Sequence, residues 1–144
     1  NSIMLMVTKI FNFEMAHAIS DYPGSCNNIH GHSYELHVTV STINQEKCYL
    51  APPGFILDFK ELKKLVNTHV IQALDHKLIL SKNYLGKNSS INPLENLVPW
   101  ESEPTAENLL LYIQSVLSEN LPVNIKLAKL KLYETKGSYA EWIS

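Results

Sequence analysis

Three of the six histidines in the sequence have a spacing that could form a metal site. His30 and His32 lie two residues apart, which on an extended backbone places both imidazole rings on the same face. Gly31 between them lets the backbone bend and another group approach. His17 ends an earlier alternating stretch and could meet the pair across a hairpin. Three neutral imidazoles with one open position are the ligand set of a catalytic zinc ion; the alternative is a chance His-x-His pair beside an ordinary surface histidine.

A cysteine stands close to these histidines in the sequence. Cys26 lies four residues before His30, among Ser25, Asn27 and Asn28, in a polar loop rather than in a core stretch. The thiolate is the form of cysteine that does chemistry, and a zinc ion nearby would favour it. We therefore interpret Cys26 as functional; the alternative is a small buried apolar residue, as most free cysteines are.

An acid–histidine pair follows the first predicted helix. In Asp75-His76, a carboxylate beside an imidazole could fix the tautomer of the ring, as a general acid/base pair requires. Adjacent side chains can also point apart. The alternative for His76 is a histidine that interacts with the dipole at the end of a helix.

A single carboxylate continues the apolar face of a late strand. Glu134 shares its face with Leu130 and Leu132, so it is expected either to be exposed at the edge of the sheet or to hold a ligand. A pterin or guanine ring presents adjacent N–H donors that one carboxylate accepts in bidentate fashion.

Alternating hydrophobicity predicts a β-hairpin that carries the histidines. Apolar and polar residues alternate from Met4 to His17, and a second alternating run extends from Ser33 to Val40. The stretch from Ser20 to Asn28 is rich in turn residues. We therefore expect two antiparallel strands joined by a long, irregular loop.

Two helices are predicted after the hairpin. Asp58 caps the first helix, which has apolar residues at helical spacing from Phe59 to about Ala73. Thr105 caps the second helix, which ends near Pro122. The segment from Ser81 to Glu103 between them is polar and without a clear period, and such long loops are often functional lids.

Two more strands complete the expected order. Ile125 to Thr135 predicts a strand with a bulge near Ala128, and a short last strand extends from Tyr139 to Ile143. The resulting order is strand, strand, helix, helix, strand, strand. Antiparallel hairpins with helices on one face define an α+β class, and residues 1–144 are expected to form one domain.

Composition excludes several classes of protein. The net charge is −2, so a dedicated nucleic-acid binder is not expected. The apolar runs are far shorter than the ~18 residues of a membrane span, and the chain, which starts at Asn1, opens with no secretion signal. Two cysteines, Cys26 and Cys48, are too few for a disulfide framework, which favours a reducing cytoplasm. Cys48 lies in a polar linker and is assigned no role.

Several sequence fragments together resemble a known family. They occur in order as Phe11-Asn-Phe-Glu-Met-Ala-His17, Cys26-Asn-Asn-Ile-His30-Gly-His32-Ser-Tyr34, Phe55-Ile-Leu-Asp58-Phe59, Leu74-Asp75-His76, Pro104-Thr105-Ala106-Glu107-Asn108 and Tyr133-Glu134-Thr135. Over nearly the whole chain the sequence is similar to the 6-pyruvoyltetrahydropterin synthase superfamily, which includes 6-carboxytetrahydropterin synthase of queuosine biosynthesis. The three residues between the cysteine and His-Gly-His resemble the bacterial 6-carboxy branch.

The resemblance implies a fold and an assembly. The fold is a T-fold, expected as an antiparallel four-stranded sheet with two helices on one face in ββααββ order. Three subunits would close a barrel, and two trimers would stack into a homo-hexamer with active sites at subunit interfaces.

The resemblance also implies roles for individual residues. Zinc (Zn2+) would be held by His17, His30 and His32. Proton transfer would fall to Cys26, Asp75 and His76, which would meet across a subunit interface. Substrate binding would involve Glu134, which anchors the pterin ring, and Thr105.

The implied reaction is cleavage of a pterin side chain. The substrate would be 7,8-dihydroneopterin triphosphate, converted to 6-carboxy-5,6,7,8-tetrahydropterin with release of acetaldehyde and triphosphate. Two alternatives stay open: a 6-pyruvoyltetrahydropterin synthase, which eliminates triphosphate and keeps the carbons, and a pterin- or metal-binding protein without turnover.

Two features depart from the family pattern. The residue after the first-strand histidine is often basic in relatives and is Ala18 here, so cations for the triphosphate would come from Lys77, Lys82 or Lys87. The segment from Lys82 to Glu103 is longer than its family counterpart and is expected to cover the pocket or alter the substrate.

Overall fold

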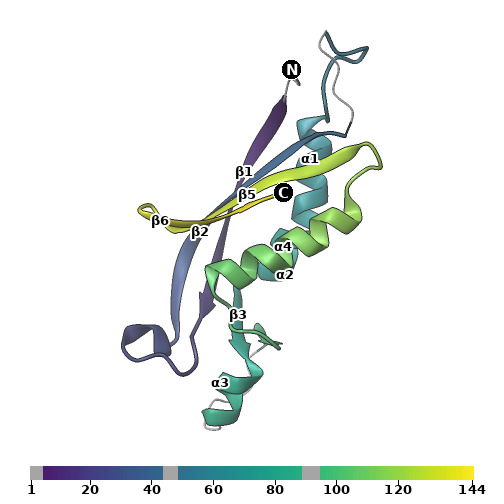
Figure 1. Ribbon diagram of the computed structural model, residues 1–144. Coiled ribbons are helices and arrows are strands. Elements are labelled where there is room, and N and C mark those ends of the chain that lie inside the picture. Colours follow the sequence, from purple (N-terminus) through teal and green to yellow (C-terminus); the bar gives the residue numbers. More distant parts are fainter. Residues whose placement is uncertain (1–4, 44–48, 89–94) are drawn as a thin grey trace.

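The computed structural model describes residues 5–43, 49–88 and 95–144, so Cys48 lies outside the described residues. Within them, the strands form one curled sheet in the order β4-β3-β1-β2-β5-β6 (Figure 1). The strands are β1 (Met6–His17), β2 (His30–Thr42), β3 (Lys77–Ser81), β4 (Leu97–Trp100), β5 (Ile125–Thr135) and β6 (Ser138–Ile143). The helices are α1 (Phe59–Val66), α2 (Gln72–Leu74), α3 (Lys82–Lys87) and α4 (Ala106–Asn120), with a 3₁₀ turn, η1 (Ser25–Asn27), and a π segment, η2 (Asn67–Ile71).

The β1–β2 hairpin forms as predicted. The two strands are antiparallel, with Met15 opposite His32 and His17 opposite His30. Along much of both strands, more buried side chains alternate with more exposed ones, and this periodicity gives the hairpin one buried face. The histidines therefore continue the buried face at the end of the hairpin.

The two predicted helices are confirmed. α1, η2 and α2 run without a break from Phe59 to Leu74, and the Asp58 side chain accepts a hydrogen bond from the backbone N–H of Lys60. Thr105 caps α4 in the same way, because its side chain accepts from the N–H of Asn108. The predicted bulge also forms: the register between β2 and β5 shifts by one residue opposite Ala128.

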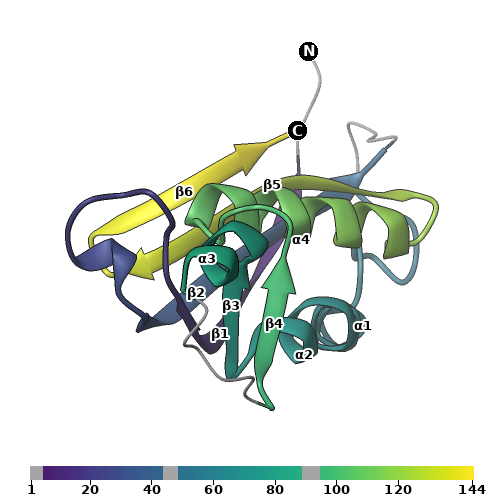
Figure 2. The same cartoon turned by 90° about the horizontal axis from the view of Figure 1, so that it is seen from below.

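The main core lies between the sheet and the helices α1 and α4, which lie on the same side of it (Figure 2). Its fully buried side chains come from both layers: Leu36, Leu130 and Leu132 from strands, and Leu62 and Ile113 from helices. Among the described residues, no helix is long and apolar enough to cross a membrane.

The expected four-stranded antiparallel sheet is wrong, because β3 and β4 widen it into a mixed sheet. β3 pairs in parallel with β1, and β4 pairs in parallel with β3. Leu78, Ile79 and Leu80 are all buried, so β3 lacks the alternation that reveals a half-buried strand. The segment from Ser81 to Glu103, expected as one lid-like loop, instead contains α3 and β4.

Candidate metal centre and active site

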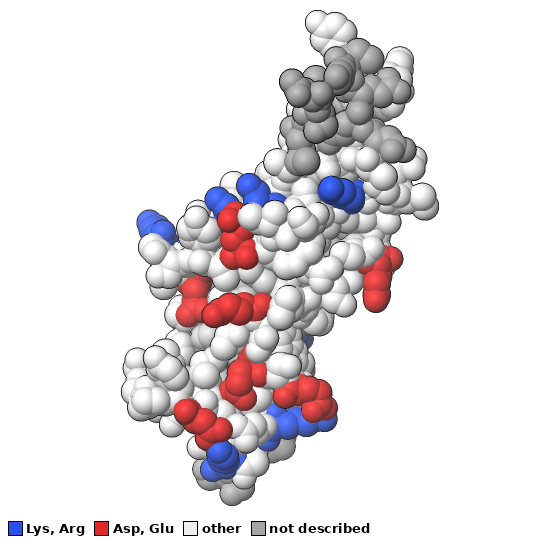
Figure 3. Space-filling model, in the orientation of Figure 1, with Lys and Arg blue, Asp and Glu red and all other residues white. Residues whose placement is uncertain are grey.

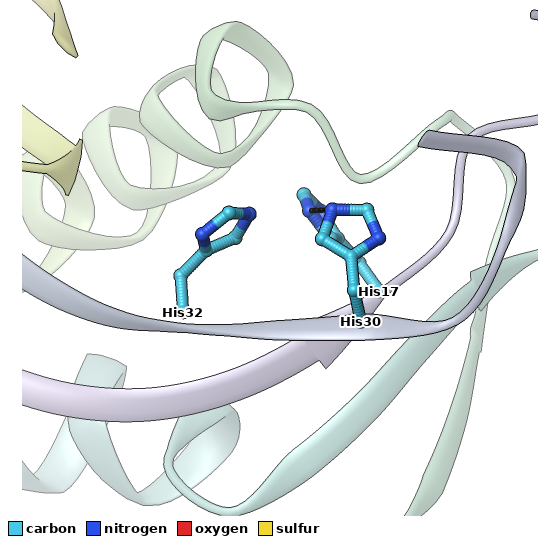
Figure 4. Close-up of side chains that lie close together, drawn as sticks. All are labelled: His17, His30 and His32. Atoms are coloured by element: carbon cyan, nitrogen blue, oxygen red, sulfur yellow. Dashed lines mark hydrogen bonds between the residues drawn. The ribbon is translucent and has the colours of Figure 1, made fainter. Parts of the chain in front are cut away.

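The hairpin brings three histidines together. The rings of His17, His30 and His32 point toward one another at the end of the β1–β2 hairpin (Figure 4), and each offers a ring nitrogen within 4.8 Å of the others. The sequence prediction that these residues converge is therefore met in the structure. Among the described residues, the candidate cluster of metal-ligating side chains consists of these three.

Backbone carbonyls fix the orientation of two of the rings. The Nδ1 atom of His17 lies 2.7 Å from the Pro104 carbonyl oxygen, and Nδ1 of His30 lies 2.7 Å from the Asn28 carbonyl oxygen. A carbonyl oxygen only accepts, so each Nδ1 carries the proton and each Nε2 presents a lone pair. Carbonyl contacts of this kind orient metal-binding histidines in many proteins.

The Nε2 atoms of His17 and His30 lie 3.1 Å apart, the contact dashed in Figure 4. Because Nδ1 of each ring already points a proton at a carbonyl oxygen, a hydrogen bond between the two Nε2 atoms needs a further proton on one of them. Two imidazole ligands of a tetrahedral zinc ion stand about 3.3 Å apart, because each bond is about 2.0–2.1 Å long. A metal cation would take the place of that proton at nearly the same separation.

His32 supplies the third nitrogen. Its Nε2 is buried and has no hydrogen-bond partner among the described residues, although Oε1 of Glu134 lies 3.0 Å away, out of line for a hydrogen bond. Burial lowers the pKa of His17 and of His32, so both rings are neutral at pH 7, the form that binds a metal. The donor set and the unpaired buried nitrogen fit a metal ion.

A buried tyrosine underlies the histidines and was missed from the sequence. Tyr34 continues the His30–His32 face of β2, its ring stacks on Phe13 with centroids 5.0 Å apart, and it contacts the edge of His17. Burial raises the pKa of Tyr34, so its hydroxyl stays protonated. The signal for Tyr34 in the sequence was its position in the alternating pattern of β2, two residues after His32.

The Asp75–His76 pair lies at the edge of β1 that faces β3. Nδ1 of His76 is 3.0 Å from Oδ1 of Asp75, which also accepts the N–H of Glu14 at 2.9 Å. His76 has a φ of 61°, and Asn96 donates to its carbonyl oxygen at 3.1 Å. Its side chain is 79% exposed and lines a 390 Å³ pocket that also includes His32. Sequence reasoning missed Glu14 and Asn96, which hold this pair.

Cys26 lies in the loop before β2 and outside the histidine cluster. It is half-buried in the turn η1, and its carbonyl oxygen accepts the N–H of Ile19 at 2.8 Å. The described chain thus places Cys26 and the Asp75–His76 pair on different segments.

Glu134 and Thr105 flank the same centre. Glu134 stands where the β5–β6 register shifts, and it lines a 700 Å³ pocket with His32 and a 480 Å³ pocket with Glu107. Thr105 follows Pro104, whose carbonyl oxygen binds His17. The Thr105 hydroxyl oxygen accepts a hydrogen bond from the backbone N–H of Asn108 in α4, and its O–H can still donate one.

Two of the three candidate cations are already paired. Lys82 pairs with Glu101, and Lys87 pairs with Asp21. Acidic side chains spread over the middle and lower part of the face in Figure 3, and basic side chains at its lower end lie beside acidic ones. Lys77 lines the pocket with His32 and His76 and has no ion pair among the described residues. Ala18 is buried against Tyr84 and Leu80, so it contributes no charge.

The fold is of the α+β class, with a sheet that β3 and β4 widen at one edge. The site is a cluster of three histidines whose ring nitrogens fit a metal ion. The model of the 6-pyruvoyl tetrahydropterin synthase family matches residues 6–143, and the chain belongs to this family of tetrahydropterin synthases.

Relatives agree with this membership, and a solved structure agrees with the fold. The chain is 28% identical to 6-carboxy-5,6,7,8-tetrahydropterin synthase of Haemophilus influenzae, covering 96% of this chain and 99% of the relative. It is 30% identical to dihydroneopterin monophosphate aldolase of Pyrococcus furiosus, covering 91% and 92%. In fold it is similar to 6-pyruvoyl tetrahydropterin synthase of Plasmodium falciparum, with a TM-score of 0.71 and 21% identity over 96% of each chain.

Proposed function

We propose that this protein is a zinc-dependent 6-carboxytetrahydropterin synthase. It would convert 7,8-dihydroneopterin triphosphate and water to 6-carboxy-5,6,7,8-tetrahydropterin, acetaldehyde and triphosphate, a step of queuosine biosynthesis. The observation that carries this proposal is the convergence of three imidazoles, two with Nε2 atoms 3.1 Å apart and one with a buried Nε2 that has no hydrogen-bond partner among the described residues. The name of the Haemophilus relative supports the reaction class.

The metal centre would activate the side chain of the substrate. Bound zinc supplies a Lewis acid that acidifies a hydroxyl in the open coordination position. Pro104 and Asn28 hold His17 and His30 with Nε2 inward, and burial keeps His17 and His32 unprotonated. The chain therefore supplies a preformed set of donors.

Proton transfer would use Cys26 and the Asp75–His76 pair. Asp75 holds His76 through Nδ1, so the other ring nitrogen is free to take or give a proton. His76 is 79% exposed in the single chain, which is consistent with a site that a neighbouring subunit completes. We propose a hexamer of two trimers with Cys26 of one subunit beside His76 of the next.

The pterin ring would be held at Glu134. Its carboxylate stands beside His32 and opens onto two pockets, so a ring bound there would reach the metal centre with its side chain. A carboxylate accepts two adjacent pterin N–H groups at once. The Thr105 hydroxyl, next to Pro104, would add a donor.

The ion pairs formed by two lysines favour one further candidate function, in which the substrate carries fewer phosphate groups. Lys82 and Lys87 are held by Glu101 and Asp21, which leaves Lys77 as the unpaired lysine of the His32 pocket. A relative 30% identical is a dihydroneopterin monophosphate aldolase. Retro-aldol cleavage of that substrate would release a phosphorylated two-carbon aldehyde rather than acetaldehyde.

Product analysis tests these reactions. Purified protein of measured zinc content is incubated separately with dihydroneopterin triphosphate and monophosphate, and products are identified by mass. We expect the carboxy-pterin and acetaldehyde from the triphosphate. Triphosphate release without acetaldehyde would indicate the pyruvoyl reaction instead, and turnover of the monophosphate alone would indicate the aldolase. Binding of pterin without any product would indicate a pterin-binding protein without turnover. Absence of metal from freshly purified protein would refute the zinc centre.

A further inference from the structure

Side chains tie the β1–β2 connection to the helix α3. Asn83 donates to Oδ2 of Asp21 at 2.9 Å, and Lys87 forms an ion pair with the same carboxylate. The hydroxyl of Ser20 lies 3.1 Å from that of Ser81, the residue that caps α3. α3 therefore lies against the connection that carries Cys26.

Tyr84 of α3 makes the most protected of these contacts. Its ring is 6% exposed and packs with Ala18, Leu78 and Leu80, while its hydroxyl donates to the Asn27 carbonyl oxygen at 2.9 Å. Its backbone N–H bonds to the Ser81 side chain at 2.9 Å. The packed ring and the capped backbone leave the hydroxyl little freedom, whereas the Asp21–Lys87 pair is exposed and therefore weak.

Three consecutive carbonyl groups in the connection are each bound. The Cys26 oxygen accepts from Ile19 N at 2.8 Å, the Asn27 oxygen accepts from Tyr84, and the Asn28 oxygen accepts from Nδ1 of His30 at 2.7 Å. The Tyr84 contact is therefore the middle one, between the thiol-bearing residue and the carbonyl that orients a candidate metal ligand.

We propose that Tyr84 is a positioning residue that holds the Cys26 thiol relative to the histidine centre. The Tyr84 hydroxyl fixes the Asn27–Asn28 peptide, one residue beyond Cys26, and the packing of the Tyr84 ring anchors that hydroxyl to the sheet. This inference rests on the proposed function in one respect, because it assigns the thiol to proton transfer. Misplacement of a reacting group by about 1 Å can cost about 100-fold in rate, so loss of one tether is expected to lower kcat.

The Tyr84→Phe variant tests the proposal, because it keeps the ring in the core and removes the hydroxyl alone. Alkylation of Cys26 by iodoacetamide at fixed pH is followed by peptide mass mapping, which separates Cys26 from Cys48. We expect several-fold faster alkylation and a roughly tenfold fall in kcat, with KM and zinc content unchanged. Tyr22→Phe is the matched control, since Tyr22 is an exposed tyrosine of the same connection, and it should change neither quantity.

Different results separate the positioning role of Tyr84 from the proposed enzymatic function. If Tyr84→Phe alkylates and turns over like Tyr22→Phe, the positioning role is refuted; faster alkylation with unchanged kcat also refutes it. If the unmodified protein turns over no pterin, the proposed function fails. Alkylation of Cys26 and hydrogen exchange of its loop amides then decide alone whether Tyr84 holds the thiol.

Discussion

At the residue scale, the candidate centre depends on what the second nitrogen of each ring binds. The carbonyl oxygens of Pro104 and Asn28 accept hydrogen bonds from Nδ1 of His17 and His30, which turns both Nε2 atoms toward the cluster. The sequence placed the three imidazoles on one face of a hairpin. It did not indicate the carbonyls that orient them, because Pro104 lies 87 residues from His17.

Removal of the Cys26 thiol should slow turnover strongly without removing the metal. A proton-transfer group contributes about 100-fold or more, so Cys26→Ala should lower kcat by at least about 100-fold. Zinc content should be unchanged because the three histidines remain. Steady-state kinetics and metal analysis check both, and Cys48→Ala is the control. Full turnover by Cys26→Ala would end the role proposed for the thiol.

The buried histidines should make the metal-free protein sensitive to acid. The pKa values of His17 and His32 are lowered in the folded state by burial, so the unfolded chain binds more protons below about pH 6.5. The free energy of unfolding should therefore fall as the pH drops from 7.5 toward 5.5. Urea unfolding after chelation measures this, and the His17→Gln/His32→Gln double variant should show a flatter pH dependence.

At the scale of elements, periodicity predicted what local sequence encodes and missed what long-range pairing decides. The β1–β2 hairpin, the two helices and the bulge at Ala128 followed from alternation, helical spacing and caps. β3 was missed because its residues are buried on both faces, which removes the period-two signal. Among the described residues β4 pairs with β3, a segment distant enough that no local pattern reveals the pairing.

The cap of α1 should contribute measurably to stability. The Asp58 side chain accepts the Lys60 N–H at 2.9 Å. Asp58→Ala removes this acceptor and should lower the free energy of unfolding by about 1 kcal/mol. Asp58→Asn retains a side-chain oxygen and is the control, expected to lose much less. Chemical unfolding of both variants gives the comparison, and equal losses would show that the cap bond is not the cause.

At the scale of the whole molecule, the separation of candidate groups bears on assembly. Cys26 lies on the β1–β2 connection, whereas His76 lies at the β3 edge of β1 with its side chain 79% exposed. An interface site brings such groups together when one subunit supplies each. The exposed side chain of His76 supports the interface site in the proposed hexamer.

Mixed subunits test the interface. Cys26→Ala and His76→Ala should each be inactive alone. Co-refolded in equal amounts, they should recover about a quarter of wild-type activity. Random mixing gives about half of the sites an intact Cys26 from one subunit, and about half of those an intact His76 from the next subunit. Activity after mixing, with subunit number from native mass spectrometry, is the measurement. No recovery in mixed assemblies would place both residues in one subunit's site.

The sequence alone indicated the candidate side chains: three histidines, one cysteine, an Asp-His pair and a glutamate. Local periodicity placed the histidines and the glutamate on faces of strands, whereas the cysteine and the Asp-His pair lie outside the strands. The tertiary structure decided which of them meet, since Glu134 reaches His32 and Tyr84 reaches Asn27 only through non-local packing. The physical reason is that strand and helix periods encode burial, whereas strand partners and the hydrogen bonds of loops depend on segments far apart in the chain.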